Sequence, residues 1–248
     1  MGPGQITHLS EIKDRDRRFE EECKQAKSKK SYHLPALILD LIPRSSFLYL
    51  IMEEKIKEVL AGRDKACIND PSLTRAAVLI PLFKKNEEYY VLLTRRTHKV
   101  RHHKGQISFP GGRQDKGEDL LSTALREAKE EMGIAPKDVR VLGELDDICT
   151  VASDFCVSPF VGLIPYPYRF KMSRLEIEEF IEVPLSAFLD ETKFREEFQE
   201  RNGEPLRVYF FQHEDHTIWG ATARILKQLL DLLPEEDKAK LKPKLDER

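Results

Sequence analysis

Long apolar runs, paired cysteines and an excess of either charge are the features that this sequence lacks. The 248-residue chain has four cysteines and no C-x-x-C pair, which argues against a disulfide framework or a zinc ribbon and favours reduced thiols. Basic residues number 41 and acidic residues 43, so a general nucleic-acid binder is not indicated. The apolar stretch 34–51 contains Pro35, Asp40 and Pro43, which argues against a membrane span. We therefore expect a cytoplasmic protein without nucleic-acid or membrane partners.

The first 51 residues differ in composition from the rest. Residues 13–30 are almost wholly charged or polar, as in a solvated helix or a disordered segment, and 34–51 is patterned for neither helix nor strand. Met52 then opens an amphipathic helix, and we interpret it as the natural start of the protein. The domains predicted are an N-terminal extension over 1–51, disordered or not native, a folded domain over 52–234 and a charged C-terminal tail over 235–248.

The folded domain alternates short β-patterned segments with amphipathic ones. Strands are predicted over 76–83, 89–94, 107–109, 139–145, 157–164, 179–183 and 207–213. Helices are predicted over 118–132 and 221–233. This order predicts an α/β (α+β) fold in which a mixed sheet packs between helices.

The helix predicted over 118–132 carries carboxylates beside its apolar stripe. Glu127, Glu130 and Glu131 share one flank, and like-charge pairs at i, i+3 and i, i+4 cost about 0.2–0.5 kcal/mol each on a free helix. A divalent cation reverses that sign, because magnesium takes carboxylate oxygens as ligands. The alternatives are a metal site and a solvated glutamate face.

The same segment resembles the Nudix box, G-x5-E-x7-R-E-U-x-E-E-x-G-U with U aliphatic, at every fixed position. The matching residues are Gly112, Glu118, Arg126, Glu127, Ala128, Glu130, Glu131, Gly133 and Ile134. The resemblance implies the Nudix fold, a mixed β-sheet between helices with a catalytic loop-helix-loop. It also implies a hydrolase acting on a diphosphate linked to a nucleoside.

Roles carried over from the Nudix resemblance fall on a few residues of this chain. Glu127 and Glu131 would be the main ligands of Mg²⁺ or Mn²⁺, with Glu130 assisting as a ligand and in catalysis. The carbonyl of Gly111 would be a further ligand, and Arg126 would orient the carboxylates. The resemblance also gives Glu118 a supporting role near the helix start.

The stretch before the box resembles the signature of the coenzyme A diphosphatase subfamily, L-L-T-x-R-[SA]-x3-R-x3-G-x3-F-P-G-G. It runs from Leu92 to Gly112, and its one departure is Thr97 where Ser or Ala is usual. Coenzyme A carries a diphosphate and a separate 3′-phosphate, so its site needs several cations besides the metal. Arginine suits this purpose because it binds phosphate in a bidentate fork. The candidate substrate-binding residues are Arg95, Arg96, Arg101 and Lys104.

A general base is less evident, and the resemblance points to Glu176 and Glu179, each of which could bind metal or take the proton of the attacking water. The predicted reaction is metal-dependent hydrolysis of coenzyme A or acyl-CoA to 3′,5′-ADP and 4′-phosphopantetheine or its acyl derivative. Two alternatives stay open: a broader hydrolase of ADP-ribose or dinucleotides, and a catalytically silent nucleotide-binding module. A small-molecule substrate is the expected partner, and the sequence leaves a homodimer open.

Overall fold

The computed structural model describes residues 44–86, 88–97, 105–150, 154–201 and 204–241. The chain divides into two compact units, Met1–Ile51 and Met52–Arg248, and the description below concerns the second. Two predicted substrate-binding residues, Arg101 and Lys104, lie outside the described residues.

The first described helix, α3, spans Arg44–Ala61. The sequence predicted a helix from Met52, so the helix begins eight residues earlier than expected. The amphipathic pattern predicted Ile56, Val59 and Leu60 on the apolar face; Ile56 and Leu60 are buried together with Met52, and Val59 is half-buried. Residues 44–51 lack this clean periodicity, which is why the pattern alone missed the first two turns.

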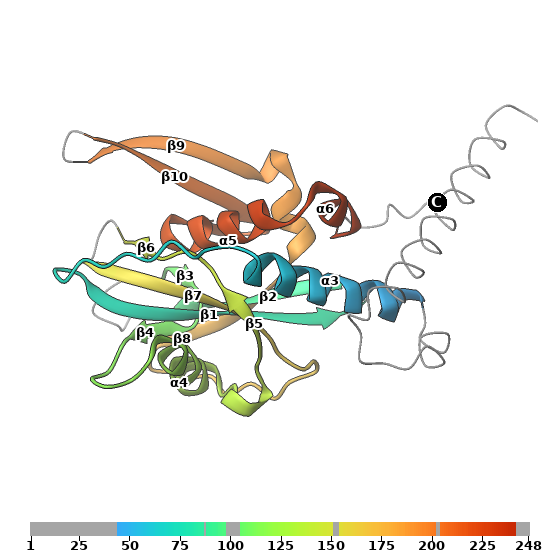
Figure 1. Cartoon of the computed structure of the whole chain (residues 1–248), viewed down its shortest axis with the longest axis horizontal. Coiled ribbons are helices and arrows are strands. Elements are labelled where there is room, and N and C mark those ends of the chain that lie inside the picture. Colours follow the sequence, from blue (N-terminus) through green and yellow to red (C-terminus); the bar gives the residue numbers. More distant parts are fainter. Residues whose placement is uncertain (1–43, 87, 98–104, 151–153, 202–203, 242–248) are drawn as a thin grey trace, which may run out of the picture. The chain divides into compact units, whose positions relative to one another are not determined.

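A mixed sheet of eight strands forms the centre of the domain (Figure 1). The strands predicted over 76–83 and 89–94 form a hairpin, in which β1 (Thr74–Lys85) pairs antiparallel with β2 (Glu88–Arg96). On its other side β1 pairs parallel with β7 (Phe155–Leu163), which pairs antiparallel with β5 (Arg140–Glu144). Strand β8 (Ile177–Pro184) lies along β2. Three short strands complete the sheet: β3 (Ile107–Ser108), β4 (Gly111–Arg113) and β6 (Ile148–Cys149).

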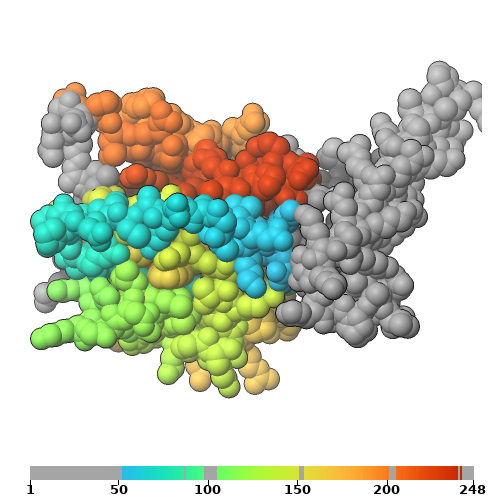
Figure 2. All heavy atoms as spheres, in the orientation of Figure 1, coloured from blue at the N-terminus to red at the C-terminus, as the bar shows by residue number. Residues whose placement is uncertain are grey.

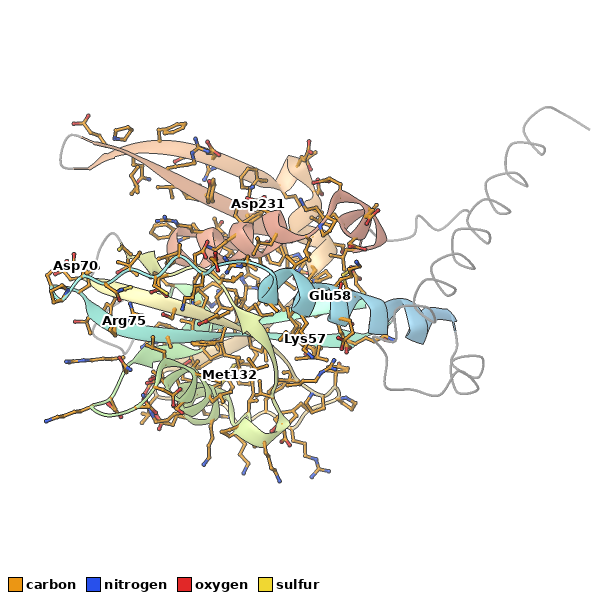
Figure 3. The ribbon with its side chains drawn as sticks, viewed as in Figure 1. Lys57, Glu58, Asp70, Arg75, Met132 and Asp231 are labelled. Atoms are coloured by element: carbon orange, nitrogen blue, oxygen red, sulfur yellow. The ribbon has the colours of Figure 1, made fainter. Side chains whose placement is uncertain are left out.

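Helix α4 (Leu120–Met132) covers one face of this sheet (Figure 1). It begins two residues later than predicted, because the Asp119 side chain accepts from the Ser122 amide and caps the first turn. It ends where Gly133 adopts φ 74°, as the helix-stop pattern indicated. Three residues of its inner stripe are fully buried against β1, β2 and β7: Ala124, Ala128 and Met132. Figure 3 labels Met132 at the end of this helix. The hydrophobic core therefore fixes the rotation of α4, and with it the direction of the glutamates.

The opposite face carries α5 (Gly220–Leu232), close to the predicted 221–233 (Figure 1). Beyond α5 lies a second sheet of three antiparallel strands, β9 (Phe194–Arg201), β10 (Glu204–His213) and β11 (His216–Trp219). The 3-10 helices η1 (Pro136–Asp138), η2 (Leu185–Leu189) and η3 (Glu191–Lys193) lie in connections. Helix α6 (Glu235–Leu241) buries Asp237 and Leu241, so the packed domain extends into the segment predicted to be a charged tail.

The segment between α3 and β1 crosses the visible surface of the domain between the α4 side and α5 (Figure 2). It is tied down by Asp147, whose buried carboxylate accepts from the Ser158 hydroxyl at 2.6 Å and the Ile68 amide at 3.1 Å. Lys65 at 3.0 Å and Arg75 at 3.1 Å balance the charge of Asp147, and Figure 3 marks Arg75 on β1. Among the described residues, no helix is long and apolar enough to cross a membrane.

Candidate active site

Arg126 lies at the centre of the carboxylates that α4 presents. It donates to Glu118 at 3.1 Å, to Glu127 at 2.7 Å and to the backbone carbonyl of Arg113 at 3.1 Å, and it lies 3.5 Å from Glu130. The Glu118 carboxylate also holds the pKa of Arg126 above its usual value, so the guanidinium stays charged. Burial raises the pKa of Glu127, although Arg126 opposes that shift. These contacts fit the orienting role that the resemblance implied for Arg126.

Glu131 is the most deeply buried carboxylate of the group, with a side chain only 4% exposed. Burial raises its pKa to about 8, and the charges of Glu127 and Glu176 add to the shift. Arg96, whose Nη1 lies 3.5 Å from Glu131 Oε1, and a backbone hydrogen bond from Gly111 act in the other direction. A carboxyl group shifted by burial and by specific charged neighbours is typical of a functional site.

Two glycines on β4 bring the strand backbone against these carboxylates. A Cβ at Gly111 would lie 2.4 Å from the Ala77 carbonyl oxygen, and a Cβ at Gly112 would lie 2.4 Å from Glu127 Oε1. A side chain at Gly111 would collide with backbone, so this position requires glycine for close approach, whereas a side chain at Gly112 would displace the end of Glu127. Gly112 leaves the space that the Glu127 carboxylate occupies.

The donors at this site fit a hard divalent cation. The described His, Cys, Asp and Glu side chains include no group of three or more already arranged to hold a metal ion. Magnesium does not require one, since it commonly takes one or two carboxylates and completes its octahedron with water and substrate phosphate. Glu127 and Glu131 supply two carboxylates. They lie one turn apart on α4 in a partly buried site, and Gly111 lies beside them. Glu130 is 60% exposed and could assist only from the solvent side.

Arg95 and Arg96 end β2 at a register shift against β8. Alternation along a regular strand would turn one of them to solvent, but here both face carboxylates. Arg95 lies 2.9 Å from Glu179, and Arg96 contacts Glu131 at 3.5 Å and Glu176 at 4.0 Å. Each Nε is buried without a hydrogen-bond partner in the described part of the chain. Each guanidinium thus has one donor without a hydrogen bond, although Arg95 Nε lies 3.7 Å from Glu178 Oε2.

The two candidate bases, Glu176 and Glu179, contact different arginines. Glu176 faces Arg96 near Glu131, whereas Glu179 is paired across the sheet with Arg95. His216, from β11, lies 3.8 Å from Glu179. No motif pointed to His216, because only the second sheet brings it to β8.

The segment that carries Arg101 and Lys104 starts and ends beside this cluster. Arg96 accepts from the Gly105 amide at 3.1 Å and donates to the Gln106 carbonyl at 3.0 Å, so the residues flanking 98–104 meet at the end of β2.

Comparison with known proteins identifies the family. The NUDIX domain model matches residues 73–158. The chain is 41% identical to the uncharacterized Nudix hydrolase NudL of Photorhabdus laumondii, over 62% of this chain and 82% of the relative. It is also 41% identical to the NudL of Pectobacterium atrosepticum, over 62% of this chain and 80% of the relative.

Two of the similar solved structures are less close in sequence. A C. elegans Ap4A hydrolase binary complex has 22% identity, covers 46% of this chain and 81% of that one, and gives a TM-score of 0.40. A MutT/nudix family protein from Enterococcus faecalis has 14% identity, coverages of 76% and 83%, and a TM-score of 0.43. The close relatives and the domain match confirm the predicted Nudix fold: the chain belongs to the Nudix family and is a hydrolase acting on pyrophosphate bonds.

Proposed function

We propose that this Nudix hydrolase cleaves the diphosphate of coenzyme A or acyl-CoA, yielding 3′,5′-ADP and 4′-phosphopantetheine or its acyl derivative. The observation that carries the proposal is the position of Arg95 and Arg96. Both belong to the segment that resembles the coenzyme A diphosphatase signature, and each Nε is buried without a hydrogen-bond partner among the described residues. Arg96 meets Glu131, and Arg95 meets Glu179. Guanidinium donors in such a place suit phosphate oxygens.

Each residue of the cluster has a distinct part in the proposed reaction. Nudix hydrolases generally use Mg²⁺ or Mn²⁺, and such an ion supplies charge neutralisation at the diphosphate and a more acidic water. Glu127 and Glu131 would hold the ion while Arg126 keeps the Glu127 carboxylate in place. Arg96 would donate to phosphate oxygens beside Glu131.

The bond changes follow from the hydrolysis itself. The oxygen of water bonds to one phosphorus, the bridging oxygen leaves with the other phosphoryl group, and the proton of water passes to a carboxylate. Glu176 is the better placed candidate for that proton, because Glu179 is already paired with Arg95 at 2.9 Å while Glu176 is 4.0 Å from its arginine. General bases must be able to reach the proton they abstract.

Product analysis tests the substrate directly. Purified protein with Mg²⁺ is incubated separately with coenzyme A, ADP-ribose and dinucleotides, and the products are separated and identified by mass. We expect the highest kcat/KM for coenzyme A or an acyl-CoA, with 3′,5′-ADP as one product. A higher kcat/KM for ADP-ribose or a dinucleotide would replace this substrate with the broader alternative, and the hydrolase chemistry would stand.

The substrate's 3′-phosphate gives a sharper test of the arginines. Arg96→Ala and Arg101→Ala should raise KM for coenzyme A and discriminate less against dephospho-coenzyme A. A charged phosphate contact is worth about 1.5–3 kcal/mol, or about tenfold to a hundredfold in affinity. Arg224→Ala, which removes an exposed arginine of α5, serves as the matched control. If KM rises equally for coenzyme A and dephospho-coenzyme A, these arginines bind the diphosphate rather than the 3′-phosphate.

A further inference from the structure

The turn before β8 brings Glu176 to the end of the catalytic helix. Its first residue, Ser173, donates from its amide to the Glu131 carbonyl at 3.0 Å. The Ser173 carbonyl then accepts from the amides of Glu176 at 2.9 Å and Ile177 at 2.8 Å. One end of this turn is therefore fastened to α4 by a backbone hydrogen bond.

Thr97, the residue after β2, fastens the other side of the turn. Its amide donates to the Glu176 carbonyl at 2.8 Å, and its hydroxyl donates to the Leu175 carbonyl at 3.0 Å. Thr97 is 8% exposed, so water competes little for either bond. The Leu175 side chain is 79% exposed and does not pack, so the turn's conformation at this point depends on hydrogen bonds rather than on burial.

This arrangement matters because Thr97 directly follows Arg96. Arg96 contacts Glu131 and lies 4.0 Å from the Glu176 carboxylate. The two bonds from Thr97 set the backbone of Glu176 beside the arginine that faces it. Any residue except proline at position 97 could donate the first hydrogen bond from its backbone N–H. The second hydrogen bond requires a side-chain hydroxyl at this position.

We propose that Thr97 is a positioning residue for the cleavage reaction: its hydroxyl fixes the Leu175–Glu176 backbone so that the Glu176 carboxylate stays opposite Arg96 and Glu131. This inference rests on the proposed role of Glu176 in hydrolysis. It also gives a physical meaning to the one position at which the chain departs from the coenzyme A diphosphatase signature. Threonine preserves the hydroxyl of serine there, whereas alanine, which the signature also admits, has none, so the inference concerns this chain and not every sequence that fits the signature.

The first test removes the hydroxyl while keeping the volume. Thr97→Val should lower kcat about tenfold or more with KM changed less than about twofold, because a displaced proton acceptor affects the chemical step rather than substrate binding. Thr97→Ser should restore kcat. Thr97→Ala removes the same hydroxyl with less bulk and replaces the valine variant if that protein does not fold.

A matched control separates positioning from a general loss of stability. The Thr222 hydroxyl donates to the Ile107 carbonyl at 3.0 Å, and the residue is 7% exposed, nearly the same as Thr97. Thr222→Val should lower the melting temperature as much as Thr97→Val does and leave kcat near the wild-type value. An equal fall of kcat in both variants would overturn the proposal.

A double-mutant cycle tests the route of the effect. If Thr97 acts through Glu176, Thr97→Val should have almost no further effect on kcat in a Glu176→Gln background. A similar loss that persists in that background, or full activity of Thr97→Val, would overturn the inference. The assay uses whichever diphosphate substrate the wild type hydrolyses fastest. Failure of the coenzyme A assignment would therefore appear in the wild-type product analysis and would not affect this cycle.

Discussion

Replacing Gly112 by alanine should inactivate the enzyme without unfolding it. The added Cβ would lie 2.4 Å from Glu127 Oε1 and 2.9 Å from Oε2, whereas ordinary van der Waals contact begins at 3.4 Å. The backbone of Gly112 does not adopt a positive φ, so the substitution adds no conformational strain. The end of a flexible glutamate is the group that must move, and the fold can stay as it is.

The size of the effect follows from these distances. The Glu127 carboxylate must retreat by about 1 Å, the difference between 3.4 and 2.4 Å, and this displaces it from Arg126, now 2.7 Å away. A misplacement of about 1 Å in a catalytic group can cost about a hundredfold in rate. We therefore expect kcat/KM to fall about a hundredfold and the affinity for Mn²⁺, measured by calorimetry, to fall with it.

Gly117, in the connection between β4 and α4, provides the control. It has φ +84°, and no atom outside its two chain neighbours lies within 4 Å of the place that a Cβ would take, so Gly117→Ala strains the backbone but does not reach Glu127. It should lower the melting temperature more than Gly112→Ala does and keep most of the activity. If Gly112→Ala retains wild-type turnover and Mn²⁺ affinity, the Glu127 carboxylate does not lie against β4 in the working enzyme, and the reasoning fails.

Four further changes test the site and the domain. Glu127→Gln and Glu131→Gln should each lose most activity at saturating Mg²⁺ while remaining folded by circular dichroism; near-wild-type turnover in either would contradict its role as a ligand. Asp147→Asn should destabilise the fold by about 3 kcal/mol in urea unfolding, because its two cationic partners lose a buried counter-charge. Although burial opposes the shift, Ser158 and the other donors hold the pKa of Asp147 below its usual value, so its contribution is present above about pH 3.9 and disappears as pH falls through the folded pKa. The stability difference from Asp147→Asn must therefore shrink on acidification. A chain that starts at Met52 should keep its melting temperature and activity, and loss of soluble protein would show that residues 34–51 stabilise the domain.

The sequence predicted the parts of the fold that depend on neighbours along the chain. Helix α4 has a local apolar stripe and a glycine after it, and each acts within one or two turns, although the Asp119 cap that fixes its first residue was not predicted. The β1–β2 hairpin is likewise a local pairing. Strands β9 and β11 were missed because their sequences are rich in charged or polar residues, and both depend on β10 between them for their hydrogen bonds.

In the candidate site, too, the local pattern predicted some features, and others depend on contacts between distant parts of the chain. Glu127, Glu130 and Glu131 could be placed on one flank from helical periodicity alone. The meeting of Arg96 with Glu131 could not, because it depends on the packing of α4 under β2 and on the register shift that turns both arginines to carboxylates. The Thr97 hydroxyl bond joins residues 78 positions apart, and no local pattern encodes such a distance.

The pairing of arginines with carboxylates would let one site serve a cation and an anion together, as the proposed function requires. Arg126 is held by Glu118 as well as by Glu127, so Glu127 can turn to a metal without leaving the arginine unpaired. Arg96 is 3.5 Å from Glu131, longer than a good charge-assisted hydrogen bond, so this pair separates at low cost. Under the proposed function, Glu127 and Glu131 would hold the metal ion while Arg96 would pair with substrate phosphate instead of Glu131. Buried charge stays paired throughout, which avoids the several kcal/mol that an isolated buried ion would cost.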